Sequence, residues 1–117
     1  MKKSEIEACL AKQKGAEGSY PFGPEALVFK VMNKMFALVS QQEEPARVTL
    51  KCRPADAETL VAQYECIIPG YHMNKKHWIT ISLTDELPDR MLIDLANGSY
   101  RLVVDSLPRK EKDKLPS

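Results

Sequence analysis

The sequence predicts an α+β fold, in which an antiparallel sheet of about four strands has helices packed on one face. Three segments with strand character follow one another between residues 26 and 53, and the connections between them are short and polar. Short connections are typical of antiparallel strands. Segments with helical periodicity precede this run and dominate the C-terminal part, so helices and strands are segregated along the chain. The length of 117 residues favours one domain, and we expect a single domain over residues 1–117.

The first predicted element is a helix that begins at Ser4. The spacing of Ser4 and Glu7 is that of a capping box, in which each side chain binds the backbone amide of the other residue. The apolar face of this helix consists of Ile6, Cys9 and Leu10. Gly15 and Gly18 end the helix, and the segment 19–24, which contains two prolines, is a rigid connector.

Three central strands are predicted from composition and from alternation. Residues 26–31 and 35–40 are dense in aliphatic and aromatic side chains. Asn33-Lys34 between them favours a tight hairpin, because Asn tolerates left-handed backbone geometry. Residues 47–53 alternate between apolar and polar side chains. One side of this strand carries Val48, Leu50 and Cys52, and the other carries Thr49, Lys51 and Arg53.

A second helix and a fourth strand follow. Pro54 suits the first position of a helix, and residues 67–71 form a short extended piece and a turn. The apolar stripe of the helix consists of Ala57, Leu60, Val61 and Tyr64. Residues 77–83 alternate again, so the same side of the strand carries His77 and the apolar residues, which favours a partly buried imidazole. Trp78, Thr80 and Ser82 lie on the other side.

The C-terminal part is predicted to contain two helices and a charged tail. The first helix begins within residues 85–88, where acidic side chains complement the positive end of the helix dipole, and it stops at Asn97-Gly98. Ser99 caps the second helix, which Pro108 ends. Its apolar stripe consists of Tyr100, Val103, Val104 and Leu107. Residues 109–114 form a short helix or a frayed tail.

Composition excludes several classes of protein. The 17 Lys and Arg residues nearly balance the 16 Asp and Glu residues, so a nucleic-acid surface would have to be a local patch. Three cysteines without a CxxC motif indicate free thiols in a reducing compartment. No signal peptide and no apolar run of about 20 residues is present, and we expect a cytoplasmic protein without membrane contact.

The segment from Pro69 to Leu83 concentrates the unusual side chains of the chain. It contains both histidines, the tryptophan and an adjacent lysine pair, and no acidic residue occurs between Glu65 and Asp85. Some cations of the predicted strands lie on the same side of the sheet as the tryptophan. The candidate binding residues are Lys30, Lys34, Lys51, Arg53, His72, Asn74, Lys75, Lys76 and Trp78. The cations would contact phosphates, and Trp78 would stack on a base. The alternative is that Trp78 packs against a loop or helix and that the lysines are a solvated rim.

Other chemistry fits these residues less well. His72 and His77 would need about two more ligands in convergent geometry to bind zinc. A nucleophilic pair of Cys66 and His72 would need a lowered thiol pKa and an oxyanion hole. A helix-turn-helix joined at residues 97–99 would have few exposed donors for base edges, and no phosphate-binding loop or hydrolase motif is present. We therefore expect no enzymatic activity, no metal and no other cofactor.

Four pieces of the sequence resemble the MmcQ/YjbR family. They are residues 21–23, 28–38, 70–78 and 99–103, and they span nearly the whole chain in the expected order. The most specific of them is the His-x-Asn-Lys-x-His-Trp block at residues 72–78. The resemblance implies a small bacterial protein with a frataxin-like (CyaY-like) fold and no catalytic residues. Members of the family are described as DNA-binding proteins on the basis of a "double wing" interpretation of the fold.

These observations together predict a non-catalytic binding module. DNA is the first partner that we expect, bound by the basic aromatic face and by the hairpin at Asn33-Lys34. The alternative is a protein-interaction or regulatory adaptor that uses the same face, with Trp78 as its anchor. Iron binding by analogy with frataxins is not expected, because the first helix mixes lysines with its glutamates and lacks an acidic ridge.

Overall fold

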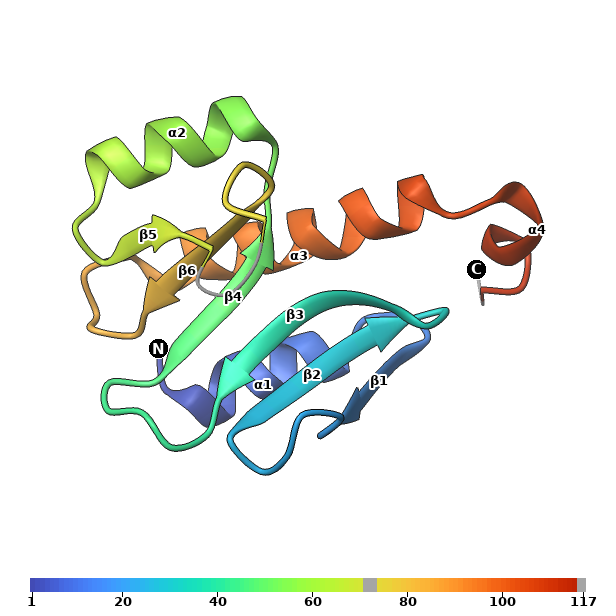
Figure 1. Cartoon of the computed structure of the whole chain (residues 1–117), viewed down its shortest axis with the longest axis horizontal. Coiled ribbons are helices and arrows are strands. Elements are labelled where there is room, and N and C mark those ends of the chain that lie inside the picture. Colours follow the sequence, from blue (N-terminus) through green and yellow to red (C-terminus); the bar gives the residue numbers. More distant parts are fainter. Residues whose placement is uncertain (71–73, 116–117) are drawn as a thin grey trace.

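The computed structural model describes residues 1–70 and 74–115, and these form four helices and six strands (Figure 1). In chain order the elements are α1 (Lys3–Ala11), β1 (Ala16–Ser19), β2 (Ala26–Val31), β3 (Lys34–Ser40), β4 (Arg47–Lys51), α2 (Pro54–Gln63), β5 (Ile67–Pro69), β6 (Trp78–Ser82), α3 (Asp89–Ser106) and α4 (Arg109–Lys112). The α+β class predicted from the sequence is confirmed.

The six strands that the structure describes form one antiparallel sheet in the order β1-β2-β3-β4-β6-β5. The four expected strands are its centre, and the predicted number of about four is too low because β1 and β5 add an edge on each side. The sequence of β1 is Ala-Glu-Gly-Ser, which has neither β-branched residues nor a regular alternation. Pairing with β2 creates this strand, whereas local propensity does not favour it.

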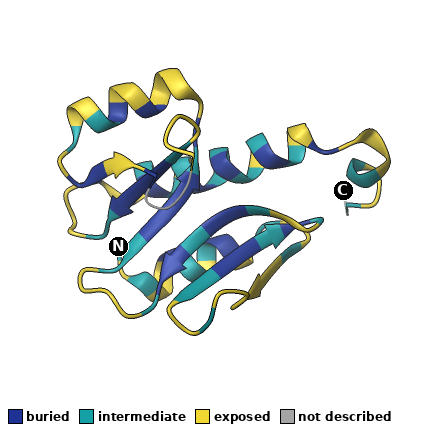
Figure 2. Cartoon of the chain, viewed as in Figure 1, coloured by how far each residue is buried: buried dark blue, intermediate teal, exposed yellow. Residues whose placement is uncertain are grey.

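The core lies on the face of the sheet that the helices cover. Figure 1 shows α1 and α3 behind the sheet, and Figure 2 shows buried residues along the central strands and on one side of α3. The sheet contributes residues such as Phe29, Val39, Val48, Leu50, Ile79 and Ile81. The helices contribute Ile6 and Leu10 from α1, Ala57 and Leu60 from α2, and Leu92, Ala96 and Val103 from α3. Most of these residues belong to the apolar stripes predicted from periodicity.

The turn of the β2–β3 hairpin lies one residue earlier than predicted. Met32 and Asn33 have φ angles of 48° and 65°, and Lys34 is already the first residue of β3. Two successive residues with positive φ are typical of a two-residue hairpin turn whose twist matches that of the strands. The sequence identified Asn33 correctly but did not show that Met32 shares the strained conformation.

Helix α1 begins with a different cap from the one predicted. The N-cap is Lys2, whose backbone amide donates a hydrogen bond of 2.8 Å to Glu5 Oε1, and Ser4 is an exposed residue of the first turn. Glu7 does not reach back to Ser4, because its carboxylate accepts a hydrogen bond of 2.7 Å from Gln41 Nε2. The spacing of three residues was correct, but it applies two residues closer to the N-terminus, and only the Glu5 side chain reaches back, because the Lys2 side chain has no acceptor.

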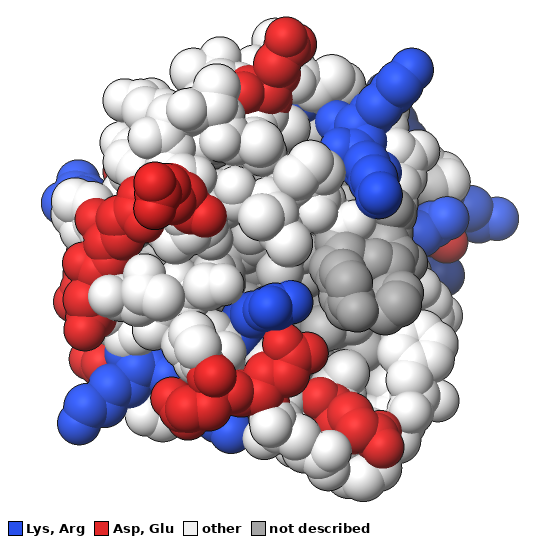
Figure 3. Space-filling model, turned by 60° about the vertical axis from the view of Figure 1, so that its left-hand side comes forward, with Lys and Arg blue, Asp and Glu red and all other residues white. Residues whose placement is uncertain are grey.

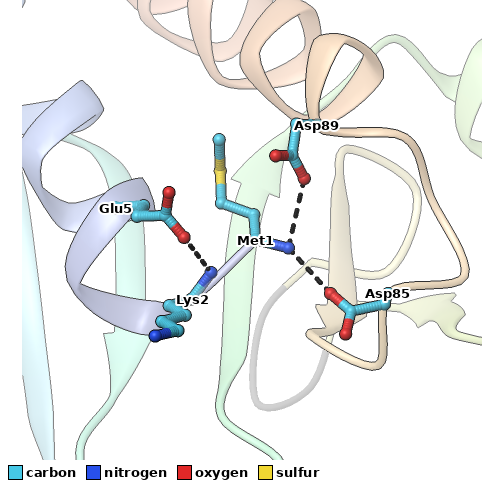
Figure 4. A network of polar contacts seen from close by, with 5 residues as sticks. All are labelled: Met1, Lys2, Glu5, Asp85 and Asp89. Atoms are coloured by element: carbon cyan, nitrogen blue, oxygen red, sulfur yellow. Dashed lines mark hydrogen bonds and ion pairs between the residues drawn. The ribbon is translucent and has the colours of Figure 1, made fainter.

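The Met1 ammonium connects α1 to the start of α3 (Figure 4). Its nitrogen lies 2.9 Å from Asp85 Oδ1 and 3.1 Å from Asp89 Oδ1. The hydrogen bond to Asp85 is the main reason why the pKa of this ammonium is raised, and the hydrogen bond to Asp89 adds to it. The same hydrogen bond lowers the pKa of the Asp85 carboxyl group.

The two C-terminal helices predicted before Pro108 are one helix. Helix α3 runs without interruption from Asp89 to Ser106, so Asn97-Gly98 does not stop it, Ser99 does not cap a new one, and its start lies just after the acidic segment 85–88. The buried residues Leu92, Ala96, Ser99 and Val103 form a continuous stripe. Burial of this stripe outweighs the turn preference of Asn-Gly.

Ser99 separates two strands of the sheet. Its hydroxyl accepts a hydrogen bond of 2.8 Å from the Lys51 amide and donates one of 2.5 Å to the Phe36 carbonyl. Strands β3 and β4 are paired at residues 37–39 and 48–50, and beyond that point they diverge (Figure 1). The hydroxyl therefore takes the place of a direct contact between the two strands.

In the part of the chain that the structure describes, no helix is long and apolar enough to span a bilayer.

Candidate nucleic-acid interface

The pairing of β4 with β6 places Lys51 directly opposite Trp78. Their neighbours in the register, Leu50 and Ile79, are buried in the core, so Lys51 and Trp78 point to the other face of the sheet. Both side chains are partly exposed. The sequence predicted that these strands share a sheet and that the two residues share a face, and the register brings them into direct contact range.

Gly70 holds the start of β6 in place. Its backbone amide donates a hydrogen bond of 2.7 Å to the Trp78 carbonyl, and a Cβ atom at position 70 would lie 2.6 Å from Trp78 Cβ. No residue with a side chain fits between these two backbones without a shift. The sequence indicated a Pro-Gly turn at this point, but it did not show that Gly70 allows the close approach that positions Trp78.

A short turn presents the two lysines that precede β6. Asn74 Oδ1 accepts a hydrogen bond of 3.0 Å from the Lys76 amide, and the Asn74 carbonyl accepts one of 3.2 Å from the His77 amide. Lys75 and Lys76 are exposed at this turn. The carboxamide oxygen of Asn74, proposed from the sequence as a selective element, is thus engaged in the turn, as is common for Asn in this kind of loop.

Arg53 lies next to the same turn. The Cys52 amide donates a hydrogen bond of 2.8 Å to the His77 carbonyl, which joins the end of β4 to the residue before Trp78. Arg53 follows directly as the exposed N-cap residue of α2. His77 is itself exposed, so the partly buried imidazole expected from strand phase is wrong. The reason is that β6 begins at Trp78, and the alternation does not extend to position 77.

Four candidates are not part of this group, and one of them is Asn74, whose carboxamide oxygen is engaged in the turn. Lys30 and Lys34 belong to the β2–β3 hairpin, on the far side of the divergence between β3 and β4. Lys30 is partly exposed and Lys34 is exposed. His72 lies outside the residues that the structure describes. The group that the fold brings together, called the Lys51–Trp78 face below, consists of Lys51, Arg53, Lys75, Lys76 and Trp78.

Two threonine hydroxyl groups on the same face are not available to a ligand. Thr49 and Thr80 are 4% and 2% exposed, and their Oγ1 atoms lie 2.9 Å apart in a hydrogen bond. The sequence predicted that both side chains point to the polar side of the sheet, and they do. Their position on that side suggested exposure to solvent, but both side chains are buried. Their cross-strand pairing satisfies the hydroxyl groups and closes the centre of the face, so the cations and Trp78 lie at its end.

The charges of the molecule are distributed in local groups. Figure 3 shows a face on which Lys and Arg side chains stand at the upper right and also at the lower left and near the centre, while Asp and Glu side chains lie along the left and lower parts and at the top. This mixture of signs agrees with the net charge of +1 and limits a phosphate-binding surface on the face in view to a small region. A long uniform track for a nucleic acid is not present on the face in view.

The thiols near this region are not activated. Burial raises the pKa of the Cys52 thiol, and the nearby Asp56 raises it further. Burial also raises the pKa of Cys66, with Glu86 adding to the effect. Nucleophilic cysteines need the opposite change. Among residues 1–70 and 74–115, no group of three or more His, Cys, Asp or Glu side chains has the arrangement of a metal site.

Comparison with known sequences identifies close relatives. A family model described as YjbR matches residues 11–102. The chain is 41% identical over 96 residues to the protein YbdF of Escherichia coli O157:H7, which covers 82% of this chain and 79% of that protein. It is 39% identical over 110 residues to the protein YjbR of Escherichia coli K12, covering 94% and 92% of the two chains. Both relatives are named as uncharacterized proteins.

Comparison with solved structures gives the same fold. The crystal structure of the Deinococcus radiodurans protein DR2400 superimposes with a TM-score of 0.88 at 34% identity, covering 97% of this chain and 86% of that one. A crystal structure of a Pseudomonas syringae protein superimposes with a TM-score of 0.75 at 24% identity, covering 87% and 98%. The second likeness concerns the fold and carries no information on activity.

Proposed function

The chain belongs to the YjbR family, and from this premise we propose that it is a non-catalytic DNA-binding module that uses the Lys51–Trp78 face. The observation that carries the proposal is the register of β4 and β6, which sets Lys51 beside Trp78 at the end of the sheet where Lys75 and Lys76 are exposed. Cations around an aromatic ring are the arrangement that binds nucleic acids through phosphates and base stacking.

Each side chain of the face has a distinct role in this proposal. Lys75 and Lys76 extend from the turn before β6 and contact successive phosphates, and Arg53 contacts a third phosphate as a bidentate donor. Trp78 offers part of its ring as a stacking surface, which contributes about 1–3 kcal/mol for each base. Stacking requires an unpaired or splayed base, so single-stranded DNA should bind more tightly than duplex DNA of the same length.

The β2–β3 hairpin extends the proposed contact surface. Lys30 and Lys34 lie on this hairpin, and the loop between β5 and β6 carries Lys75 and Lys76, so two hairpins present cations on separate parts of the sheet. In this proposal the two hairpins act as two wings on either side of the bound nucleic acid. A nucleic acid that is long enough to reach both hairpins would make more phosphate contacts, and its affinity would depend more steeply on salt.

The proposal of a non-catalytic role is supported by the raised pKa of the two thiols nearest the face. Cys52 lies between Lys51 and Arg53, and Cys66 lies just before β5, and both thiols are kept protonated near neutral pH. A face built from lysines, an arginine and an indole ring can bind anions and stack on bases.

A fluorescence-anisotropy titration with labelled single- and double-stranded DNA tests the proposal. Lys75→Ala/Lys76→Ala should lower the affinity about tenfold at low salt and reduce the slope of log K against log salt by about 2. The matched control is Lys12→Ala/Lys14→Ala, which removes two exposed lysines that follow α1, on the helical side of the sheet, and should leave the affinity nearly unchanged.

Absence of binding at about 20 mM salt would overturn the proposal, because phosphate contacts are strongest at low ionic strength. An equal loss of DNA affinity in the two double-lysine variants would show that any surface cation can contribute to binding. The Lys51–Trp78 face would then have no special role. A face that captures a protein, but not DNA, would favour the alternative of an interaction adaptor anchored by Trp78.

A further inference from the structure

A groove separate from the Trp78 ring lies between α2 and α3. The first half of α2, the middle of α3 and the end of β4 line a space of about 440 Å³. Its apolar lining comes from Cys52, Leu60, Leu95 and Leu102. The volume lies within the range of about 300–1,000 Å³ that is typical of sites for small ligands.

Gly98 lies on the wall of this groove, and packing does not explain its presence. It is an interior residue of the 18-residue helix α3, where Gly is less favourable than Ala. A Cβ atom at this position would meet nothing within 4 Å. The fold therefore tolerates a larger residue here, and the missing side chain keeps the groove open.

The rim of the groove carries unpaired charges of both signs. Arg53 and Arg101 line it, and in the described part of the chain neither guanidinium group has an ion-pair partner within 4.0 Å. Asp56 and Asp105 line it as well and are equally unpaired, whereas Asp94 lies 3.7 Å from Arg90. Lys51 lines the groove as a third cation, so three cations and two unpaired anions surround an apolar floor.

We propose that this groove binds a small zwitterion with an apolar body, such as a dipeptide of apolar amino acids. A guanidinium group of Arg53 or Arg101 would bind the carboxylate in a bidentate manner, which is the recognition for which Arg is best suited. Asp56 or Asp105 would accept hydrogen bonds from the ammonium group. The apolar side chains would lie on Leu60, Leu95 and Leu102, in the space that the absence of a side chain at position 98 leaves free.

The charge pattern distinguishes this ligand class from others. An anion without a positive group would face the two unpaired carboxylates, and a cation would face Lys51 and the two arginines. A purely apolar molecule would leave all of these charged groups without partners. A molecule that carries both charges at the ends of an apolar body satisfies both sets of groups. Lys51 and Arg53 belong both to this groove and to the Lys51–Trp78 face, so DNA is left out of the test.

An NMR titration of the ¹⁵N-labelled chain with the dipeptide phenylalanyl-leucine tests this site in the absence of DNA. The amide signals of Gly98, Arg101 and Cys52 should shift and saturate together. N-acetylation of the dipeptide, which removes the ammonium group, and its conversion to the amide, which removes the carboxylate, should each weaken binding about tenfold. Arg101→Ala should weaken the binding of the dipeptide and should not change the binding of the analogue that lacks the carboxylate.

Gly98→Leu provides the blocking variant, because the added side chain enters free space in a helix that Leu favours more than Gly. The Gly98→Leu variant should fold, and its amide signals should no longer shift when the dipeptide is added. Gly98→Ala should retain most of the binding. The proposal is overturned if the dipeptide causes no saturable shifts up to about 10 mM, a concentration at which even a weak ligand of this size binds. It is also overturned if the shifts persist in Gly98→Leu or if both singly charged analogues bind as well as the dipeptide.

Discussion

Ser99 shows how one side chain changes the shape of this sheet. Its hydroxyl accepts from the Lys51 amide and donates to the Phe36 carbonyl, so two backbone groups at the divergence of β3 and β4 are satisfied by one residue of α3. The side chain is 0% exposed. Because Lys51 is also part of the proposed binding face, Ser99 supports that face from the core side.

Ser99→Ala should lower the free energy of unfolding by about 1–3 kcal/mol, since it leaves a backbone donor and a backbone acceptor without their partner. Urea denaturation followed by circular dichroism measures the change. The matched control is Ser106→Ala at the exposed end of the same helix, where Ser106 Oγ donates to the nearby Val103 carbonyl and the loss should stay within about 0.5 kcal/mol. Equal effects at the two positions would contradict the role assigned to Ser99.

Helix α3 illustrates how tertiary packing overrides local preference in an element. Asn97-Gly98 is a turn dipeptide, and in an isolated peptide it would weaken the helix at its centre. In the fold, the buried stripe on either side of this dipeptide packs against the sheet and α1, and Gln13 Nε2 donates a hydrogen bond of 2.6 Å to Asn97 Oδ1. These contacts make the helix continuous despite its sequence.

Glycine substitutions at two positions should have opposite effects. Gly98→Ala should raise the free energy of unfolding by about 0.5–1 kcal/mol, because the position is helical and open. Gly15→Ala should lower it by about 1 kcal/mol or more, because Gly15 has a φ of 73° and a Cβ atom there would lie 2.8 Å from Leu115 Cδ2. Thermal unfolding of the two variants provides the comparison, and a destabilised Gly98→Ala would show that the helix depends on the glycine.

At the scale of the whole molecule, polar contacts join segments that are far apart in the chain. The Met1 ammonium binds Asp85 and Asp89, and the Tyr100 hydroxyl donates a hydrogen bond of 2.6 Å to the Lys14 carbonyl (Figure 4 shows the first of these). These contacts attach the segment around α1 to the connection between β6 and α3 and to α3 itself. The helical layer is thus linked at two points in addition to its apolar core.

The contact of the Met1 ammonium with Asp85 predicts a pH window of stabilisation. The pKa of the ammonium is raised above its ordinary value of 8.0, so its contribution is complete below pH 8.0 and is lost as the pH rises through the raised pKa. The pKa of Asp85 is lowered from 3.8, so its contribution is complete above pH 3.8 and is lost as the pH falls through the lowered pKa. The interaction should therefore stabilise the fold most between these two values.

Asp85→Asn tests this window, because Asn tolerates the positive φ of 67° at position 85 while removing the charge. The difference in the free energy of unfolding between the two proteins should be largest near neutral and mildly acidic pH and should shrink toward both extremes. Asp105→Asn, at an exposed position without an ion pair among the described residues, should give a small difference with little dependence on pH. A constant difference for Asp85→Asn would exclude the charge interaction as its cause.

Periodicity predicted the elements that bury a regular apolar face. Strands β4 and β6 and helices α1 and α2 begin and end within a few residues of the expected positions, because their apolar residues repeat with period 2 or 3.6 and are in fact buried. Strand β2 was predicted from its density of apolar residues. The edge strand β1 could not be predicted, since hydrogen bonds to β2 are what order its four residues. The exposure of Thr49 and His77 also depended on neighbours that strand phase does not identify.

Within the candidate interface, the sequence by itself determined which residues are unusual, which strand phase they occupy and which family they resemble. These properties follow from local composition and periodicity, which act over a few residues. The tertiary structure decided that Lys51 is opposite Trp78, that Lys30 and Lys34 lie on a separate hairpin, and that Gly98 opens a groove. Such relations depend on strand register and helix packing, and those are set by contacts between residues that are distant in the chain.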